Sequence, residues 1–441
     1  MVETNIDYFS KFNVICTCQM PPQTVSKIAE YAWKNNIIFF NARSYGFLGY
    51  IRVALPELRI YENHNPEFKD LRLNDPFPEF MEFANNFDID CVKDTNLTAG
   101  ERLSQHADVP WLILAPILRK KWKESVGEIN EDEAEESFKK FVKDSRLKHP
   151  EKESKADEEN YDELAANAWL VVSYDDYYDI PCNVQDVFDD DKINLNAESD
   201  KFWVLSAALK SFVEKEGNGK HLPLTGALPD MHGSTVNYLA LQTVYKDKSN
   251  NDLKAFRQHL ELVMKQVGKF NQFTEITETE IERFYKNARF IEVQRYRSLE
   301  QEKSWNVDDL SMLFMMINED ENAKNIVWYL LFRAVDAFFI KNGRYPGDTD
   351  KTYEEDIKAL QELAQTFAKE SSLDFTGAFP NLNDYAHEMT RYGGGELHNV
   401  ASIVGGTVAQ EVIKTVTGQW VSANNTWIFN GINSSSLQFN A

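Results

Sequence analysis

The stretch "FNVICTCQMPPQTVSKIAEYAWKNNIIFFNARSYGFLGYIRVAL", residues 12–55, decides the fold class. It contains a short apolar run at 12–18, a segment with apolar residues at helical spacing, and two further apolar runs at 37–42 and 46–55. The run at 37–42 is almost continuously hydrophobic, which is typical of a strand buried on both faces. A strand, a helix and a second strand at this spacing predict a right-handed crossover with parallel pairing. The stretch therefore predicts part of a doubly wound α/β sheet.

Helical patterns dominate the sequence from about residue 60 to about residue 390. After residue 395 the chain returns to mixed character, with a helix at about 397–417, a short strand at 427–429, and a turn before a last strand. A sheet-forming segment at each end of a helical stretch predicts one sheet domain that is split by an insertion. We expect a first sheet segment at 1–58, a mostly helical insertion at 59–390, and a returning sheet segment at 391–441. The fold class is α/β plus mostly α.

The net charge narrows the range of partners. The 441 residues carry a formal charge of −23, which repels phosphate backbones and anionic lipids, so we expect neither nucleic-acid nor membrane binding. The charge suits a basic protein partner. No apolar run reaches the roughly 18 residues that span a bilayer, and the first residues lack a signal-peptide pattern. We expect an intracellular protein of the cytoplasm or the nucleus.

Catalytic motifs are missing where the chemistry would need them. No G-x-G-x-x-G fingerprint follows a strand, and the glycine-rich "RYGGGELH" at 391–398 favours a turn over an anion site. "HEMTR" at 387–391 has arginine where a zinc-protease motif needs its second histidine. Cys16 and Cys18 alternate in an apolar run and are predicted to be buried, while Cys182 has acidic neighbours that disfavour a thiolate. We therefore expect no catalytic, cofactor-binding or metal-binding residue in this chain.

The helix near the C-terminus, "ASIVGGTVAQEVIKTVTGQW" at 401–420, carries two adjacent glycines. Each glycine in a helix interior costs roughly 1 kcal/mol relative to alanine. An apolar band through Val400, Ile403, Val404, Val408, Val412 and Ile413 predicts that the helix continues past them. The residues assigned to a structural packing patch are Gly405, Gly406 and Ala409. We expect the backbone of another element to approach closely there, as the returning segment packs onto the split sheet.

Several segments together resemble the regulatory subunit of the enzymes that activate ubiquitin-like modifiers in the neddylation pathway. They include "DLRLNDPFPEF", "LPLTGALPDM", "RAVDAFFIKNGRYPG" and "HNVASIVGGTVAQEVIKTVTGQWVSANNTWIFNG". The resemblance covers nearly the whole chain. It implies a Rossmann-like adenylation domain of ThiF type, split by a helical insertion related to a catalytic-cysteine domain. It also implies that ATP, magnesium and zinc are bound by the catalytic partner subunit and not by this one.

The resemblance further implies a segment that binds the catalytic subunit. The matching residues are Pro229, Asp230, Met231, Tyr238, Leu241, Gln242 and Tyr245. Tyrosine, methionine and leucine are common interface anchors. An alternative from spacing alone is that Tyr238, Leu241 and Tyr245 form the buried stripe of one helix.

One departure from the family separates two functional hypotheses. The family opens with a further segment that carries a YDRQLRLWG-like motif, which this sequence lacks, so the adenylation domain is expected to be truncated. Arg43 occupies a matching family position but is given no catalytic role. The leading hypothesis is a regulatory subunit that binds the catalytic subunit and the ubiquitin-like modifier and supports ATP-dependent adenylation and thioester loading. The alternative is a truncated, non-activating adaptor or decoy that binds the catalytic subunit.

Overall fold

The computed structural model describes residues 5–62, 69–90, 97–127, 129–148, 154–172, 179–268 and 276–440. The chain forms two compact units, one of residues 1–63 and 293–441 and one of residues 64–292. We call them unit 1 and unit 2. Cys91 lies outside the described residues. No helix among the described residues has both the length and the apolar content that crossing a bilayer requires.

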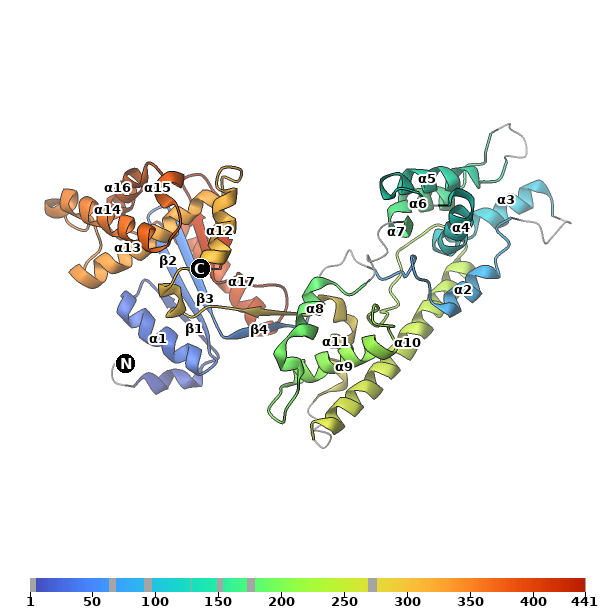
Figure 1. Ribbon diagram of the computed structural model, residues 1–441, viewed down its shortest axis with the longest axis horizontal. Coiled ribbons are helices and arrows are strands. Elements are labelled where there is room, and N and C mark those ends of the chain that lie inside the picture. The colour runs from blue at the N-terminus through green and yellow to red at the C-terminus, as the bar shows by residue number, and fades with distance from the viewer. Residues whose placement is uncertain are drawn as a thin grey trace. The chain divides into compact units, whose positions relative to one another are not determined.

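Unit 1 combines a sheet with helices (Figure 1). Its elements are η1 (Ile6–Lys11), β1 (Val14–Cys18), α1 (Pro22–Lys34), β2 (Ile38–Tyr45), β3 (Leu48–Ala54), β4 (Glu57–Ile60), β5 (Glu292–Arg295, beginning at the boundary), η5 (Gln301–Lys303), α12 (Val307–Met316), η6 (Ala323–Asn325), α13 (Ile326–Asn342), η7 (Asp350–Thr352), α14 (Tyr353–Glu370), α15 (Phe375–Ala378), α16 (Leu382–Tyr392), α17 (His398–Thr417), β6 (Thr426–Asn430) and β7 (Ser435–Phe439).

The main sheet of unit 1 has the strand order β1-β2-β3-β6-β7. The predicted parallel pairing is confirmed for β1 and β2, where Val14 lies opposite Ile38. The other three pairings are antiparallel, so the sheet is mixed. A tight turn at Gly46, with φ at +57°, joins β2 to β3 and replaces a crossover helix. The α/β class is confirmed, and the sheet contains one parallel pair.

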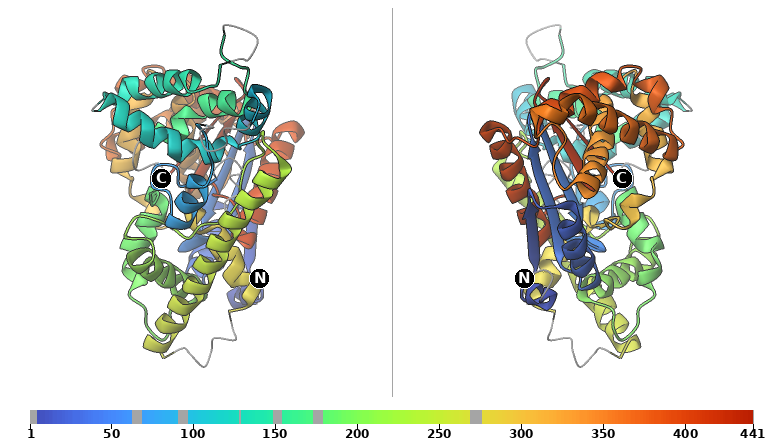
Figure 2. Two further views of the ribbon diagram at one scale, coloured as in Figure 1. Left: turned by 90° about the vertical axis from the view of Figure 1, so that its right-hand side faces the viewer. Right: turned by 90° about the vertical axis from the view of Figure 1, so that its left-hand side faces the viewer.

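Helices cover both faces of this sheet because its strands alternate between two apolar sets (Figure 2). On β3, Ile51 and Val53 pack with Val400, Val404 and Val408 of α17. The alternate residues Leu48 and Tyr50 pack in the cluster that contains α13 and α14, and the neighbouring Ala54 packs in the cluster of α1. The central strands β2 and β3 are therefore buried on both faces, as the continuous hydrophobicity of this part of the sequence predicts.

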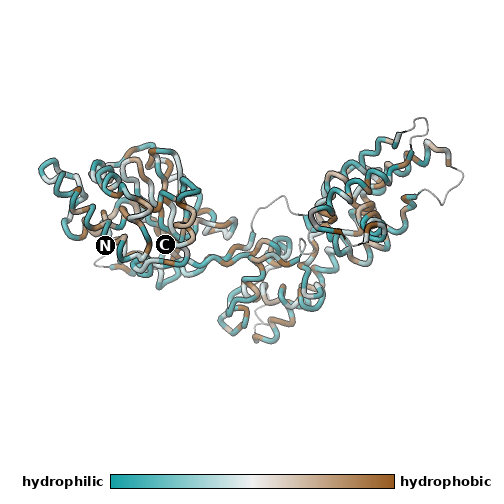
Figure 3. Tube along the Cα trace, turned by 45° about the horizontal axis from the view of Figure 1, so that its top comes forward, coloured by the Kyte–Doolittle hydropathy of each residue, from teal (hydrophilic) through white to brown (hydrophobic). Residues whose placement is uncertain are grey.

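Unit 2 is built of helices (Figure 1). Its elements are α2 (Pro78–Asn85), α3 (Ala99–Ala107), α4 (Trp111–Val126), α5 (Glu131–Asp144), α6 (Glu159–Ala166), α7 (Ala168–Val172), α8 (Cys182–Asp189), η2 (Asp191–Ile193), α9 (Lys201–Lys215), α10 (Thr235–Gln266), α11 (Glu278–Lys286) and η4 (Ala288–Phe290). Figure 3 shows hydrophilic and hydrophobic residues alternating along the helices, as amphipathic helices require.

The extent of the insertion differs from the prediction. The chain rejoins unit 1 at residue 293, whereas the sequence pattern placed the return at about 391. Residues 293–390 are mostly helical after β5, but Trp328 and Leu331 of α13 and Leu360 of α14 belong to the hydrophobic cluster that also contains sheet residues. A helical pattern identifies the element and not the unit on which the element packs. The predicted boundary at 390 therefore marked a change of secondary structure and not a change of folding unit.

Candidate functional site

The segment predicted to bind a partner lies in unit 2, where an irregular loop leads into α10. Ser234 caps the helix, since its hydroxyl accepts the backbone N–H of Asn237 at 3.2 Å. The backbone N–H of Ser234 and the side-chain amide of Asn237 both donate to the carbonyl of Asp108, at 2.9 and 3.0 Å. A Cβ at Gly233 would lie 2.9 Å from Pro110 Cγ. The first turn of α10 is thus held against the α3–α4 connection.

Two of the seven predicted partner-binding residues belong to the core of unit 2. Leu241 and Tyr245 have no exposed surface. The hydroxyl of Tyr245 donates to the carbonyl of Leu71 at 2.7 Å, and its ring packs edge-on against Phe77 and Phe80 with centroids 5.2 Å apart in both cases. Their place in the helix is the buried stripe that the spacing alone predicted. In this structure neither side chain is available to a partner.

The other predicted residues are spread over different environments. Asp230 and Gln242 are exposed, while Pro229, Met231 and Tyr238 are half-buried. Met231 packs against the same core cluster as Tyr245. The seven residues therefore do not form one accessible patch.

The accessible apolar surface of α10 lies on the opposite side of the helix. Val236 is 75% exposed and Leu239 is 52% exposed, and Thr243 follows one turn later on the same side. We call Val236, Leu239 and Thr243 the outer face of α10. The sequence contained this signal, because Val236 and Leu239 fall outside the stripe of Leu241 and Tyr245. The family resemblance pointed to other residues of α10 instead.

An exposed histidine ties the loop before α10 to α6. His232 lies with Nδ1 2.7 Å from Glu163 Oε1 and with Nε2 2.6 Å from Glu159 Oε2. Its backbone N–H donates to Glu163 Oε2 at 2.9 Å. The hydrogen bond that His232 donates to Glu163, together with the charge of Glu159, raises the pKa of His232 above its ordinary value. Protonation of this histidine therefore strengthens the attachment of the loop.

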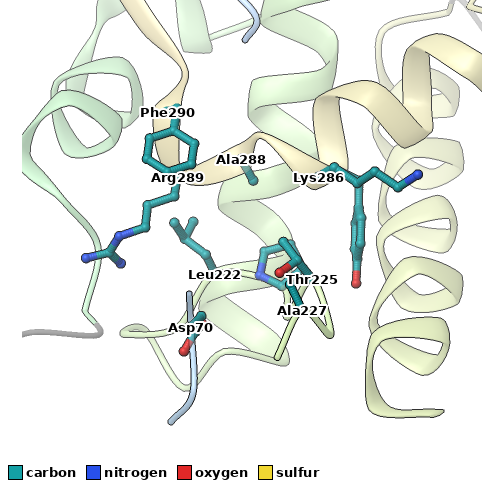
Figure 4. A pocket seen from close by; sticks show the side chains of 10 residues that line it. Asp70, Leu222, Thr225, Ala227, Lys286, Ala288, Arg289 and Phe290 are labelled. Carbon is teal, nitrogen blue, oxygen red and sulfur yellow. The ribbon is translucent and has the colours of Figure 1, made fainter. Parts of the chain in front are cut away.

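A cavity of about 310 Å³ lies beside the same loop in unit 2 (Figure 4). Loop residues such as Leu222 and Pro223 face Tyr285, Lys286 and Ala288 across it. The lining set is Asp70, Leu222, Pro223, Thr225, Ala227, Tyr285, Lys286, Ala288, Arg289 and Phe290. In Figure 4 the charged ends of Lys286 and Arg289 point to opposite sides.

The polar groups of this cavity are held by the protein. Asp70 pairs with Arg72, whose Nε lies 2.9 Å from Asp70 Oδ2. The Tyr285 hydroxyl lies 2.6 Å from the carbonyl of Leu224 and 2.8 Å from that of Ser249, and burial raises its pKa. No base is placed beside a nucleophile here. The cavity is suited to apolar groups and not to proton transfer.

The residues of the near-miss motifs make structural contacts. Arg391 forms an ion pair with Glu388 at 2.6 Å, and the His387 ring packs edge-on against Tyr353. Gly393 ends α16 in a left-handed conformation, which accounts for the first glycine of the "RYGGGELH" loop. Among the described residues, no group of three or more His, Cys, Asp or Glu side chains is placed to hold a metal ion.

The prediction that Cys16 and Cys18 are buried is wrong. Both are exposed, whereas Ile15 and Thr17, which alternate with them, are buried. Thr17 and Ile15 face the side of α1, so the cysteines face the side of α17, and α17 packs on β2 and β3. β1 is the edge strand of the sheet, and α17 does not cover it, so the side of β1 that carries the cysteines is exposed. Partial burial still raises the pKa of both thiols, which disfavours a reactive thiolate. Cys182 is also exposed, at the start of α8.

The double glycine also differs from its prediction. The helix does continue through it, from His398 to Thr417, as expected. However, a Cβ added at Gly405 or Gly406 would meet no described atom within 4 Å, and Ala409 is exposed. The close approach expected within this chain is therefore absent from the described structure. The small residues lie on the side of α17 opposite Val404 and Val408.

A buried carboxylate makes the contact that ties α17 to the following segment. Glu411 Oε2 accepts the hydroxyl of Ser422 at 2.8 Å and the backbone N–H of Ala423 at 2.6 Å, while Lys414 pairs with Oε1 at 2.7 Å. The sequence signal was a charged residue on the buried side of an apolar helix. Such a residue needs partners of its own.

Arg43 is engaged inside unit 1. Its Nη1 lies 2.6 Å from Asp336 Oδ1, and its guanidinium stacks over the ring of Phe332 at 5.1 Å. The arginine is buried. A guanidinium held by a carboxylate and an aromatic ring serves to join β2 to α13.

Comparison with known proteins places the chain in a family. No family model matches it. The chain is 32% identical to the NEDD8-activating enzyme E1 regulatory subunit of Gallus gallus over 446 residues, covering 100% of this chain and 79% of that protein. It is 31% identical to the NEDD8-activating enzyme E1 regulatory subunit AXR1 of Arabidopsis thaliana, covering 99% of this chain and 76% of that protein. It is 30% identical to the Drosophila melanogaster subunit, with 98% and 76% covered. The chain belongs to the family of NEDD8-activating enzyme E1 regulatory subunits.

Proposed function

We propose that this protein is the regulatory subunit of a heterodimeric enzyme that activates a ubiquitin-like modifier of the NEDD8 type. Its role is to bind the catalytic subunit and to support adenylation and thioester loading of the modifier without supplying the reacting groups. The observation that carries the proposal is identity at 30–32% across essentially the whole chain to regulatory subunits from a bird, a plant and an insect. The enzyme acts in the cytoplasm or the nucleus.

The two units have counterparts in this proposal. Unit 1, with a two-sided α/β sheet, corresponds to the Rossmann-like adenylation domain, and the mostly helical unit 2 corresponds to the insertion related to a catalytic-cysteine domain. ATP, magnesium and zinc belong to the catalytic subunit. The exposed cysteines of this chain lie outside any described ligand cluster, so no step of the reaction is assigned to them.

The outer face of α10 is the proposed contact with the catalytic subunit. Val236 and Leu239 are large apolar side chains that water covers in this chain, and burying them favours association. Asp230 and Gln242 are exposed nearby and serve as polar contacts at the rim. Leu241 and Tyr245 act indirectly, because they anchor the helix that presents this face.

Reconstitution tests the role of the chain. The purified chain is mixed with the catalytic subunit, the modifier and Mg-ATP, and the thioester is followed on non-reducing gels. A regulatory subunit supports thioester formation. The alternative, a non-activating adaptor, would bind the catalytic subunit and leave the thioester absent. Absence of binding would contradict both.

A pair of variants tests the surface. Val236→Glu with Leu239→Glu is expected to weaken binding of the catalytic subunit at least tenfold, since central apolar contacts carry most of an interface's energy. Leu262→Glu is the matched control, because Leu262 is 49% exposed farther along the same helix. If the double variant and the Leu262→Glu control bind the catalytic subunit with equal affinity, the interface lies elsewhere.

A further inference from the structure

The helix α12 of unit 1 is apolar on two sides. Its inner side is covered, since Leu310 is fully buried and Leu313 and Phe314 pack against the core cluster of the unit. Its outer side carries Met312, which is 69% exposed, and Met315, which is 79% exposed. A helix that is apolar all round is normally buried. The outer side of α12 therefore has the composition of an interior surface.

The exposed methionines form one continuous surface. Met312, Met315 and Met316 follow at spacings of three and four residues, so they lie side by side along the helix. Met316 is 50% exposed. Methionine is flexible and polarisable, and it recurs on surfaces that bind apolar segments of other proteins. Three such side chains on a helix of ten residues exceed the scattered exposure that is normal for a surface.

Carboxylates lie at both ends of this surface. Asp308 is exposed one turn before Met312 and on the same side of the helix. Glu319 is exposed just beyond the end of α12, where its backbone N–H donates to the carbonyl of Met316 at 2.9 Å. Neither carboxylate forms an ion pair with another described residue. Lys324, the next lysine along the chain after α12, pairs with Glu321 at 2.5 Å.

We propose that Met312, Met315 and Met316, with Asp308 and Glu319, dock a basic amphipathic helix of a partner protein. Apolar side chains of that helix cover the methionines, and Lys or Arg residues at its two ends pair with the two carboxylates. A rise of about 1.5 Å per residue places Asp308 about 12 Å from Met316 along the helix, and Glu319 lies just beyond that end. Two helices that pack ridge into groove fit a convex helical surface better than an extended strand does. The net charge of −23 adds attraction for such a partner. The inference does not rest on the proposed function.

A synthetic peptide tests the chemistry with the full chain. The probe is a helical peptide of about 18 residues with leucine on one stripe and lysine at both ends, and its control has glutamate in place of lysine. The basic peptide is expected to bind, and its affinity to fall as NaCl rises from about 0.05 to 0.5 M. Binding of the acidic control with equal affinity would overturn the assignment of charge.

Variants of the surface locate the binding. Met312→Gln, Met315→Gln and Met316→Gln in one chain keep the side-chain length at exposed positions, so the fold is expected to persist. Peptide affinity is expected to fall at least tenfold. The matched control is Ile340→Gln, at a residue that is 56% exposed near the far end of α13. Unchanged affinity in the triple variant would refute the proposal.

Oxidation of the methionines gives an independent readout. With dilute peroxide and mass spectrometry, Met312 and Met315 are expected to oxidise faster than Met264, which is 2% exposed. The basic peptide is expected to slow their oxidation several-fold. If they resist oxidation as Met264 does in the free chain, or if the bound peptide leaves their rates unchanged, the surface is not the docking site.

Discussion

Replacing both glycines of α17 by alanine is expected to stabilise the protein. Gly405 and Gly406 lie in the interior of a helix of 20 residues, where each glycine costs about 0.8–1.0 kcal/mol relative to alanine. An added Cβ would meet no described atom within 4 Å at either position, so no clash offsets the gain. Gly405→Ala with Gly406→Ala should therefore raise the free energy of unfolding by about 2 kcal/mol, which corresponds to roughly 4–8 °C in Tm for a unit of this size.

The measurement is thermal and urea unfolding of the purified chain, followed by circular dichroism. Gly49→Ala is the matched control, because Gly49 lies on β3 directly beneath the same helix. There a Cβ would lie 2.7 Å from Val404 Cγ2 and 3.2 Å from Phe429 Cβ. Overpacking of this kind costs about 1–3 kcal/mol. Gly49→Ala is therefore expected to lower the free energy of unfolding, whereas the same replacement at Gly405 and Gly406 raises it.

A loss of stability in the double variant would refute the reasoning, since it would mean that another part of the chain covers the glycines. The same variant also tests whether a partner approaches the helix there. In that case the free chain gains stability while its complex with the catalytic subunit weakens, because two methyl groups enter a space that the partner's backbone needs.

Three further predictions concern unit 2. Glu158→Ala should destabilise it by about 3 kcal/mol, measured by urea unfolding, because the fully buried Glu158 hydrogen-bonds His106 and the change leaves polar groups buried without partners; a loss below 1 kcal/mol would contradict this. The pKa of His232 is raised in the folded chain, so the stability that it contributes is fully present at pH values below its ordinary pKa of 6.5. This stability is lost as the pH rises through the raised pKa. Glu163→Gln should move the midpoint of the His232 titration, measured by NMR, toward 6.5. An unmoved midpoint would exclude Glu163 as the cause. Tyr245→Phe should cost about 1 kcal/mol by removing one buried hydrogen bond, and should leave binding of the catalytic subunit intact; a tenfold weaker complex would return Tyr245 to the interface.

Hydrophobic spacing predicted elements better than it predicted which surfaces they cover. The band of Val400, Ile403, Val404, Val408, Val412 and Ile413 was sufficient to predict that α17 continues past its glycines. It did not identify the buried side correctly throughout, because Ile403 and Ile413 are 44% and 59% exposed. Whether the other side of the helix is buried or exposed depends on which element lies next to it. The same limit explains Cys16 and Cys18, whose strand was identified correctly but whose open side depends on where α17 ends its cover of the sheet.

The candidate interface could be predicted in part. Spacing alone proposed a buried stripe of Tyr238, Leu241 and Tyr245, of which Leu241 and Tyr245 are buried and Tyr238 is half-buried. The family resemblance selected a segment in which core residues and surface residues are mixed. Val236 and Leu239 were readable as apolar residues outside that stripe. The methionine surface was harder to find, because α12 is apolar on both sides and its outer side has no distinguishing period.

The pairing of β4 with β5 has a consequence for how the chain can be rearranged. These strands form a two-stranded sheet where the chain leaves the first part of unit 1 and where it returns. Paired strands lie about 5 Å apart, so the exit and the return are neighbours in space although most of unit 2 separates them in sequence. Unit 2 is therefore a segment that could be exchanged as a whole between relatives. Such an exchange would change the binding properties of the protein and leave the main sheet of unit 1 unaltered.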